Sequence, residues 1–322
     1  MERPRRVGLA LLVLTLVVTA LFGGGCGAAA EPDRDQIGRR AAVVREVRVA
    51  PRIVDLEVRS PALGQTATVR LLTPTGWAEQ RRSRRWPVVY LLHGCCDSYE
   101  SWTRSTDIES WPRLRNVLVV MPEGGEVGFY SNWLGSGGRR GPAWETFHLT
   151  ELRGLLERDY GAGRRRAIAG LSMGGLGAML YAAREPRLFR AAASFSGLLH
   201  PLEDADFLLG LFSSYTSDPH AIWGDPRRDR SVWAHHDATE LAGRLRALPL
   251  FVSAGNGRPG PLDATSRSDA IERTVFRESR AFVARLQRLG IPVRADFYGP
   301  GTHAWPYWER ELERALPTLL AP

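Results

Sequence analysis

Short runs of apolar residues recur along the chain after residue 86, separated by longer and more polar stretches. Continuous apolar runs of this length are typical of strands that are buried on both faces of a parallel sheet. The pattern predicts six such strands, at residues 87–92, 117–121, 166–170, 191–195, 250–253 and 293–298.

The stretches between these runs have the spacing of amphipathic or buried helices. Strand and helix therefore alternate, which predicts an α/β fold with a mostly parallel central sheet flanked by helices. Two earlier segments, 43–58 and 67–72, alternate apolar and polar residues and predict two antiparallel edge strands. The expected helices are residues 144–160, 173–184, 269–289 and 305–316.

Residues 200–248 interrupt this rhythm with two Asp-Pro pairs and several aromatic residues. A long segment without a strand–helix pattern is uncommon inside a compact domain and is often a functional insertion. We interpret it as a cap-like insertion over the active-site edge of one catalytic domain that spans residues 43–322.

The first 30 residues have the layout of a secretory signal: basic residues, an apolar stretch over 7–22, and then small residues. Residues 31–42 would form a tether to the domain. Cleavage after Ala30 would release a secreted protein, whereas lipid attachment at Cys26 would associate it with the cell envelope. Both routes predict export.

Composition narrows the function classes. A chain of 322 residues with 44% hydrophobic content can bury one large core. The net charge is +8, but 35 acidic residues are interspersed with the basic ones, which favours a mixed-charge surface and no nucleic-acid partner. All 43 basic residues are arginine, a bias typical of a GC-rich, for example actinobacterial, genome. Without lysine, Schiff-base chemistry is excluded.

Besides Cys26, the cysteines are the adjacent pair Cys95 and Cys96. Neighbouring cysteines can bridge only through a strained ring, so we expect two small buried side chains and a fold that does not depend on disulfides. The sequence has no metal-ligand spacing and predicts neither a metal nor a cofactor.

The segment "AIAGLSMGGLGAML" contains Ser172 in a Gly-x-Ser-x-Gly pattern. A predicted strand precedes it and a predicted helix follows, which is the setting of a nucleophile at a sharp strand-to-helix turn. Gly170 and Gly174 would allow strand and helix to approach closely. The backbone N–H of Met173, at the start of the helix, would help to hold an oxyanion.

A serine nucleophile needs a histidine base and an acid that follow it in the chain. His303 lies after the last predicted strand and before the last helix, where parallel sheets place their functional residues. Four carboxylates qualify by order as its partner, and spacing does not choose among them: Asp263, Asp269, Glu272 and Glu278.

The loop after "VVYLLHG" is expected to complete the site. The backbone N–H of Cys95 would be the second oxyanion donor. His93, at the end of a strand, is expected to line the pocket.

From residue 86 to 316 the chain resembles the antigen 85 mycolyltransferases within the esterase D-like group of α/β hydrolases. The resemblance runs through "VVYLLHG", "VVMPEGGEVGFYSNW", "WETFHLTEL", "GLSMGG", "AGNG" and "GTHAWPYW". It implies an α/β-hydrolase fold. It also implies that the acid is the helical glutamate Glu272, which gives a triad of Ser172, Glu272 and His303.

The chain departs from this family beside the oxyanion loop. Members that handle trehalose have an Asp and an Arg where this chain has His93 and Cys96, whereas Trp305 is retained. These three positions are the expected substrate contacts. Because two sugar contacts are missing, hydrolysis or transfer to another alcohol should outweigh transfer to trehalose.

The sequence therefore predicts an exported serine esterase that acts on small-molecule or lipid acyl esters through an acyl-enzyme. The alternative within the same class is mycolyltransferase-like acyl transfer to a sugar or glycerol acceptor. The alternative of another class is a non-catalytic envelope protein that binds carbohydrate or matrix proteins, because the antigen 85 group includes members that lack the triad.

Overall fold

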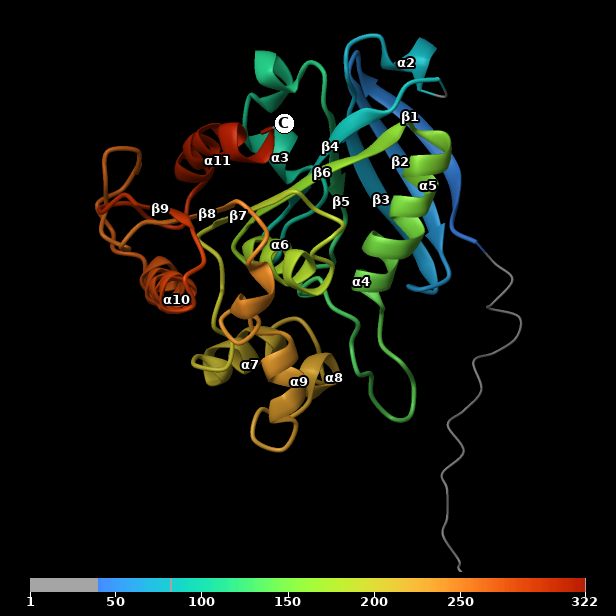
Figure 1. Ribbon diagram of the computed structural model, residues 1–322. Coiled ribbons are helices and arrows are strands. Elements are labelled where there is room, and N and C mark those ends of the chain that lie inside the picture. Colours follow the sequence, from blue (N-terminus) through green and yellow to red (C-terminus); the bar gives the residue numbers. More distant parts are fainter. Residues whose placement is uncertain (1–39, 82, 322) are drawn as a thin grey trace, which may run out of the picture. The chain divides into compact units, whose positions relative to one another are not determined.

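Strands from the whole length of the domain form one mixed sheet. The computed structural model describes residues 40–81 and 83–321, and Figure 1 shows their arrangement. In the described residues the sheet has nine strands in the order β1-β2-β3-β5-β4-β6-β7-β8-β9. The strands are β1 (Ala42–Ala50), β2 (Ile53–Ser60), β3 (Gln65–Leu72), β4 (Trp86–Leu92), β5 (Leu118–Pro122), β6 (Ala162–Leu171), β7 (Ala191–Phe195), β8 (Leu250–Ala254) and β9 (Arg294–Phe297).

The strands β4 to β9 correspond to the six predicted apolar runs and pair in parallel. Their carboxyl ends therefore meet at one edge of the sheet, where α/β proteins place their functional residues. The predicted fold class, a mostly parallel sheet flanked by helices, is confirmed.

The antiparallel part of the sheet has three strands, and the prediction of two was wrong. A turn at Pro51 and Arg52 divides the segment 43–58 into β1 and β2, which pair with each other. β3 pairs with β2 and also joins the parallel part through β5. Alternation continues on both sides of the turn, so periodicity did not reveal the reversal.

β9 was predicted to be buried on both faces, and this was also wrong. It is the last strand of the sheet and pairs only with β8. Arg294 and Ala295 are exposed, and Asp296 and Phe297 are half-buried. An edge strand needs less apolar surface because one side has no neighbouring strand.

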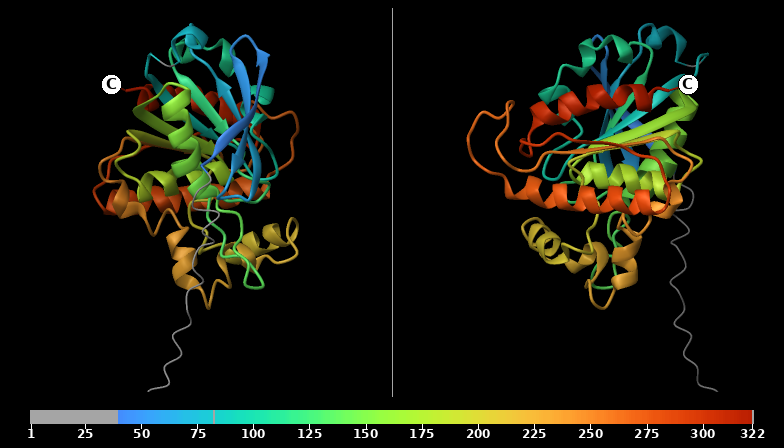
Figure 2. Two further views of the ribbon diagram at one scale, coloured as in Figure 1. Left: turned by 90° about the vertical axis from the view of Figure 1, so that its right-hand side faces the viewer. Right: turned by 60° about the vertical axis from the view of Figure 1, so that its left-hand side comes forward.

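Helices cover both faces of the sheet (Figures 1 and 2). α5 (Arg153–Asp159), α6 (Met173–Arg184) and α10 (Ala270–Arg288) pack on one face, while α3 (Ser101–Ser105) and α11 (Trp305–Leu319) pack on the other. The predicted helix 144–160 begins with α4 (Trp144–Thr146) and a π-helical stretch, η3 (Phe147–Leu152), before α5. The remaining short helices of this part are α2 (Trp77–Gln80), η1 (Ile108–Ser110) and η2 (Pro112–Leu114).

The segment 200–248 forms a group of short helices, α7 to α9, that lie together in Figure 1. Aromatic rings hold this group to the segment around Phe129, whose ring centroid lies 4.9 Å from that of Phe212 and 5.4 Å from that of Trp223. These buried aromatic residues therefore act as core. The helices are α7 (Ala205–Ser213), α8 (His220–Trp223), α9 (Arg230–His235) and η4 (Ala242–Leu245).

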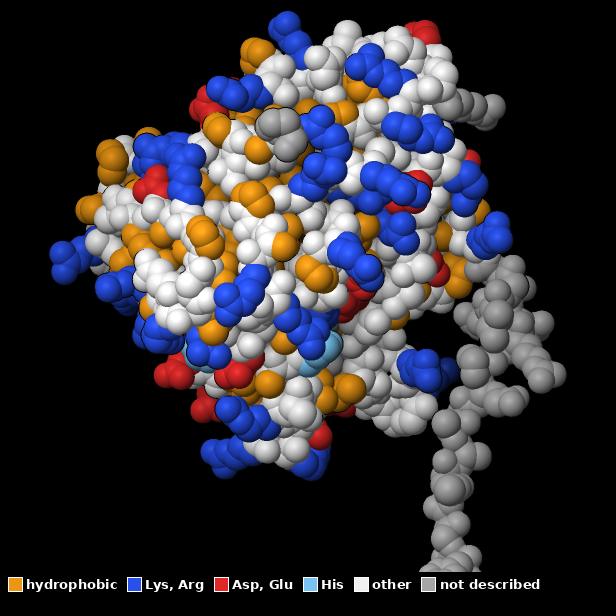
Figure 3. Space-filling view, viewed as in Figure 1, with side chains coloured by type: hydrophobic (Ala, Val, Ile, Leu, Met, Phe, Trp, Pro, Cys, Tyr) orange, Lys and Arg blue, Asp and Glu red, His pale blue; other side chains and the backbone are white. Residues whose placement is uncertain are grey.

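The expected signal segment 1–30, with Cys26, and most of the expected tether lie outside the described residues. β1 begins at Ala42, one residue earlier than the predicted start of the domain. Within residues 40–81 and 83–321, no helix has the length and apolar character needed to cross a bilayer. On the face shown in Figure 3, arginine side chains are spread over the surface with acidic ones among them.

Candidate active site

Ser172 occupies the sharp turn between β6 and α6. Its backbone has φ 53° and ψ −119°, a conformation that L-residues rarely adopt. The turn requires glycine on both sides. A Cβ at Gly170 would lie 2.2 Å from the Gly174 carbonyl oxygen, and one at Gly174 would lie 2.5 Å from the His93 carbonyl oxygen. The elbow geometry expected from the motif is therefore present.

The two expected oxyanion donors, the backbone N–H groups of Met173 and Cys95, form no backbone hydrogen bond outside the regular helices and strands of the described residues. Met173 is the first residue of α6, where N–H groups have no partner within the helix. Cys95 follows Gly94, and a Cβ added at Gly94 would lie 3.3 Å from Ser172 Cβ. The loop 93–96 thus lies directly beside Ser172.

Glu272 and His303 are joined by a hydrogen bond of 2.7 Å between Glu272 Oε2 and His303 Nδ1. Glu272 is fully buried. Its other oxygen, Oε1, accepts hydrogen bonds from Ser196 Oγ at 2.8 Å and from the Gly255 N–H at 2.7 Å. These two donors fix the carboxylate, and the carboxylate in turn orients the imidazole through Nδ1. His303 Nε2 forms no hydrogen bond with the described residues, Ser172 Oγ included.

Contacts through Phe195 and Ser196, at the carboxyl end of β7, link the backbone of Ser172 to this pair. The Ser172 N–H donates to the Phe195 carbonyl at 2.9 Å. The next residue, Ser196, holds Glu272 and also accepts a hydrogen bond of 3.1 Å from Trp308 Nε1. The ring of Trp308 lies edge-to-face with that of His303, with centroids 4.9 Å apart.

Three carboxylates that qualified by order have other partners. Asp269 caps α10 by accepting the Glu272 N–H at 3.0 Å, and its other oxygen accepts the His303 N–H at 3.1 Å. Asp263 accepts hydrogen bonds from the Gly260 N–H, the Tyr307 hydroxyl and the Thr302 hydroxyl. Both therefore brace the loop that carries His303.

Glu278 lies elsewhere in the core. It is 1% exposed, and one of its oxygens accepts the His200 N–H at 2.9 Å. Burial, together with nearby Asp204, raises the pKa of Glu278 well above its ordinary value. Its hydrogen bond is to the His200 backbone, whereas His303 Nδ1 is bonded to Glu272, so Glu278 does not orient the imidazole of His303.

The expected contact of His93 with substrate is wrong, because His93 is only 1% exposed and both ring nitrogens are used. Nδ1 lies 2.7 Å from the Gly94 carbonyl oxygen, and Nε2 accepts the Gly124 N–H at 2.9 Å. Since Nε2 is an acceptor, the proton is on Nδ1. His93 holds the loop and does not line the pocket.

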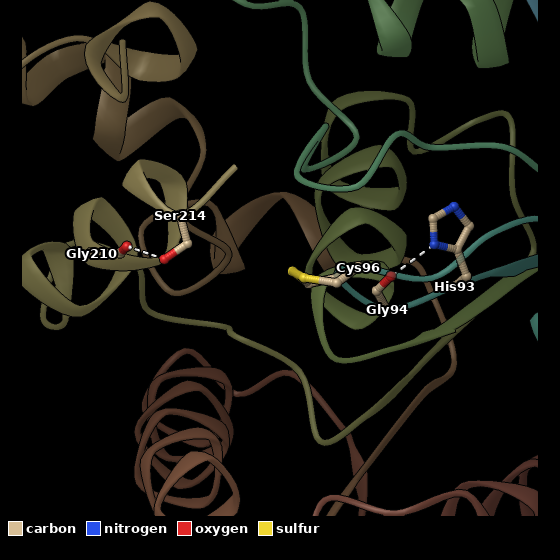
Figure 4. The surroundings of a disulfide bond; sticks show 6 residues. His93, Gly94, Cys96, Gly210 and Ser214 are labelled. Atoms are coloured by element: carbon tan, nitrogen blue, oxygen red, sulfur yellow. Dashed lines mark hydrogen bonds between the residues drawn. A yellow bond between two sulfur atoms is a disulfide. The ribbon is translucent and has the colours of Figure 1, made fainter. Parts of the chain in front are cut away.

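The interpretation of Cys95 and Cys96 as two small buried thiol side chains was also wrong. They form a disulfide between adjacent residues (Figure 4), and Cys96 is exposed. Sequence spacing could not decide this outcome because the bond depends on the turn that the loop adopts. Trp305 is half-buried and packs edge-to-face on Trp102 and Trp308, with both centroid distances 5.3 Å.

Three residues that support the pair of Glu272 and His303 were not predicted from the sequence in this role: Ser196, Asp269 as a cap, and Trp308. Ser196 directly follows a predicted strand in "SFSG", and that position was a usable signal. Asp269 stands three residues before Glu272, a spacing typical of a helix cap. Within the described residues no group of three or more His, Cys, Asp or Glu side chains is arranged to hold a metal ion.

Two buried histidines outside the site should make the protein sensitive to mild acid. Burial lowers the pKa of His148 to about 4 and that of His236 to about 3. Below the unfolded value near 6.5, the unfolded chain binds protons that the folded protein does not, so stability is lost as the pH falls from there toward 4. We expect the free energy of unfolding to fall by about 1.4 kcal/mol per pH unit for each histidine.

Urea unfolding at several pH values between 7 and 4 measures this slope. The variant His148→Gln should reduce the slope by the contribution of one histidine, about 1.4 kcal/mol per pH unit. The same change at exposed His220 should not alter the slope. Equal slopes in the wild type and His148→Gln would contradict the prediction, whatever the absolute stability of the variant.

Known proteins resemble this chain over most of its length. The family model described as "Putative esterase" matches residues 60–319. The diacylglycerol acyltransferase/mycolyltransferase Ag85B of Mycobacterium leprae is 31% identical over 282 residues, which cover 82% of this chain and 82% of that protein. The corresponding Ag85A of Mycobacterium tuberculosis is 30% identical and covers 96% of this chain and 90% of its own length.

Solved structures show the same architecture. The crystal structure of Mycobacterium tuberculosis MPT51 (FbpC1) superposes with a TM-score of 0.66 at 26% identity, covering 82% of this chain and 97% of the other. FphF, a fluorophosphonate-binding serine hydrolase of Staphylococcus aureus, gives a TM-score of 0.66 at 20% identity, covering 84% and 98%. The latter likeness concerns the fold alone.

Proposed function

Since the chain belongs to the putative esterase family and, within it, to the antigen 85 group of acyltransferases and esterases, we propose that it is a serine esterase acting on carboxylic acyl esters. Ser172 is the nucleophile, His303 the base and Glu272 the acid of its triad. The observation that carries the proposal is the buried Glu272 carboxylate, hydrogen-bonded to His303 at the edge where Ser172 occupies a strained turn.

The proposed reaction begins when His303 Nε2 takes the proton of Ser172 and the serine oxygen attacks the ester carbonyl. Glu272 holds the ring through Nδ1 and stabilises the imidazolium that forms. The N–H groups of Met173 and Cys95 stabilise the tetrahedral oxyanion, with a contribution of about 3 kcal/mol for each donor in comparable sites. The alcohol then leaves with the proton from His303, and an acyl-enzyme remains.

The second half of the reaction decides between hydrolysis and transfer. Water releases the free acid, whereas a bound sugar or glycerol hydroxyl yields a new ester. Trp305 is the proposed substrate contact, because it is a half-buried residue at the start of α11, two positions after His303.

A fluorophosphonate probe tests the nucleophile directly. It should attach to Ser172, and mass spectrometry of the proteolytic peptide that contains "GLSMGG" should locate the adduct. If the intact, folded protein takes up no probe, the proposal is wrong and the non-catalytic binding protein becomes the better interpretation. Uptake at another serine would instead show that Ser172 is not the nucleophile.

Transfer to trehalose should be slower than hydrolysis. The two positions at which trehalose-handling members of the family have Asp and Arg are buried His93 and disulfide-bonded Cys96, and neither offers a charged group to a sugar. Each lost hydrogen bond to a charged group is worth about 1.5–3 kcal/mol, so we expect free acid to exceed trehalose ester about tenfold or more. Thin-layer or mass-spectrometric analysis of products from a short-chain acyl ester with excess trehalose, or with glycerol for comparison, gives the ratio. Trehalose ester as the main product would contradict this expectation.

We also propose export through residues 1–30, with either release after Ala30 or lipid attachment at Cys26. The basic, apolar and small residues of this segment support the proposal. The mass of the mature N-terminal peptide distinguishes the two products, and a protein that keeps its unmodified first residue inside the cell would contradict both.

A further inference from the structure

The Cys95–Cys96 disulfide lies within the loop that carries one of the proposed oxyanion donors. It closes a ring that includes the peptide between Cys95 and Cys96, in the loop where a Cβ added at Gly94 would lie 3.3 Å from Ser172 Cβ. No step of the proposed reaction uses either sulfur. The bond therefore needs another explanation than chemistry on the substrate.

Two hydrogen bonds anchor this loop, one at the peptide between Gly94 and Cys95 and one at the peptide between Cys95 and Cys96. The carbonyl oxygen of the first peptide, on Gly94, accepts a hydrogen bond from His93 Nδ1 at 2.7 Å. Since the peptide is planar and trans, holding this oxygen also directs the Cys95 N–H, which points the opposite way. At the second peptide, the Cys96 N–H donates to the Glu126 carbonyl at 2.8 Å.

Directly after the second anchor Cys96 adopts φ 66°, the left-handed region that favours glycine. An open chain with a side chain at this position has lower-energy conformations available. A covalent bond between the two side chains restricts the backbone torsions of both residues, so fewer of those conformations are accessible. In the view of Figure 4 the Cys96 side chain is directed toward Gly210 and Ser214, in and just after the last turn of α7. Cys96 is exposed, so a reductant can reach the bond.

We propose that the Cys95–Cys96 disulfide is a positioning element that keeps the Cys95 N–H aimed at the oxyanion, so that the enzyme is fully active only with this bond closed. The proposal rests on the proposed function. Loss of one oxyanion donor lowers kcat about 10²–10³-fold in comparable enzymes. Because the released loop keeps the His93 and Glu126 anchors, a partial loss of about tenfold or more in kcat is expected, with little change in KM.

A water-soluble phosphine opens the bond without cleaving the ester substrate. The phosphorus attacks one sulfur and the S–S bond breaks; water then supplies the oxygen of the phosphine oxide, and both sulfurs end as thiols with one proton each. Oxidised glutathione reverses the change by forming two molecules of reduced glutathione. Alkylation and peptide mass spectrometry count the free thiols at residues 95 and 96 separately from Cys26.

The experiment compares kcat and KM of the full chain on a p-nitrophenyl ester before reduction, after reduction and after reoxidation. Reduction should lower kcat and reoxidation should restore it. The variant Cys26→Ser should respond in the same way. The double variant Cys95→Ser/Cys96→Ser should have the low kcat in every state and ignore the reductant.

A second variant, Cys95→Ala/Cys96→Gly, distinguishes loss of the disulfide's restraint from loss of folding. Glycine accepts φ 66° freely, so this chain should fold and recover part of the kcat that the double serine variant loses. An unchanged kcat in the reduced enzyme, or a change in KM alone, overturns the positioning role. If Ser172→Ala is as active as the wild type, the proposed function fails instead, independently of the disulfide.

Discussion

Replacing Ser172 with alanine should lower kcat for p-nitrophenyl esters by about 10⁶-fold, the loss seen when a triad serine is removed from a comparable enzyme. The reason is that Ser172 is the one residue of the described chain between β6 and α6, so no other hydroxyl or thiol occupies this turn. The N–H groups of Met173 and Cys95 would still polarise a bound carbonyl, so a small residual rate above that of water is expected. Initial-rate measurements with saturating ester give kcat.

The fold should survive this change. Ser172 Oγ has no hydrogen bond to the described residues, and alanine meets the same backbone constraint at φ 53° as serine does. Ser194→Ala is the matched control, because Ser194 is fully buried one strand away and its hydroxyl has no partner either. That control should keep wild-type activity. More than about one hundredth of wild-type kcat in Ser172→Ala, at an unchanged melting temperature, would mean that the nucleophile lies elsewhere.

Replacing Glu272 with glutamine should lower kcat by about 10⁴-fold, the magnitude known for the equivalent change in a serine protease triad. The expected decrease in kcat follows from the contacts of the Glu272 carboxylate. Ser196 Oγ and the Gly255 N–H both donate to Oε1, so a glutamine must place its oxygen there and its NH₂ group toward His303. His303 Nδ1 then has to accept, which puts the ring proton on Nε2. In that tautomer the imidazole cannot take the proton of Ser172.

Glu278→Gln is the matched control for this prediction. Glu278 lies on the same helix α10 and is equally buried, and burial raises its pKa, which favours the protonated form. Its replacement should leave kcat within about twofold of the wild type, since an amide resembles a protonated carboxyl in size and polarity. If the two variants lose activity equally, burial of a helix carboxylate and not its hydrogen bond to His303 explains the loss.

Most of the architecture could be predicted from local patterns. The runs 191–195 and 173–184 match β7 and α6 residue for residue. A strand that is buried on both faces has to be apolar throughout. A buried helix that follows a glycine-rich turn needs small and apolar residues, so the sequence pattern is strong for both elements. Predictions failed where the same local pattern serves two arrangements, as at the turn of Pro51 and Arg52 and at edge strand β9.

By itself the sequence determined the order of the chemical groups along the chain: a serine at an elbow, then several acids, then a histidine after the last strand. It also predicted the elbow, because glycines flank Ser172 between a predicted strand and a predicted helix. The structure adds the reason: a Cβ at Gly170 or Gly174 would come within 2.2–2.5 Å of a backbone oxygen. Tertiary structure alone decided which acid meets His303, what His93 does, and that Cys95 and Cys96 are bonded. These outcomes depend on distances between residues far apart in the chain, or on the exact turn of a loop, and neither leaves a periodic trace in the order of amino acids.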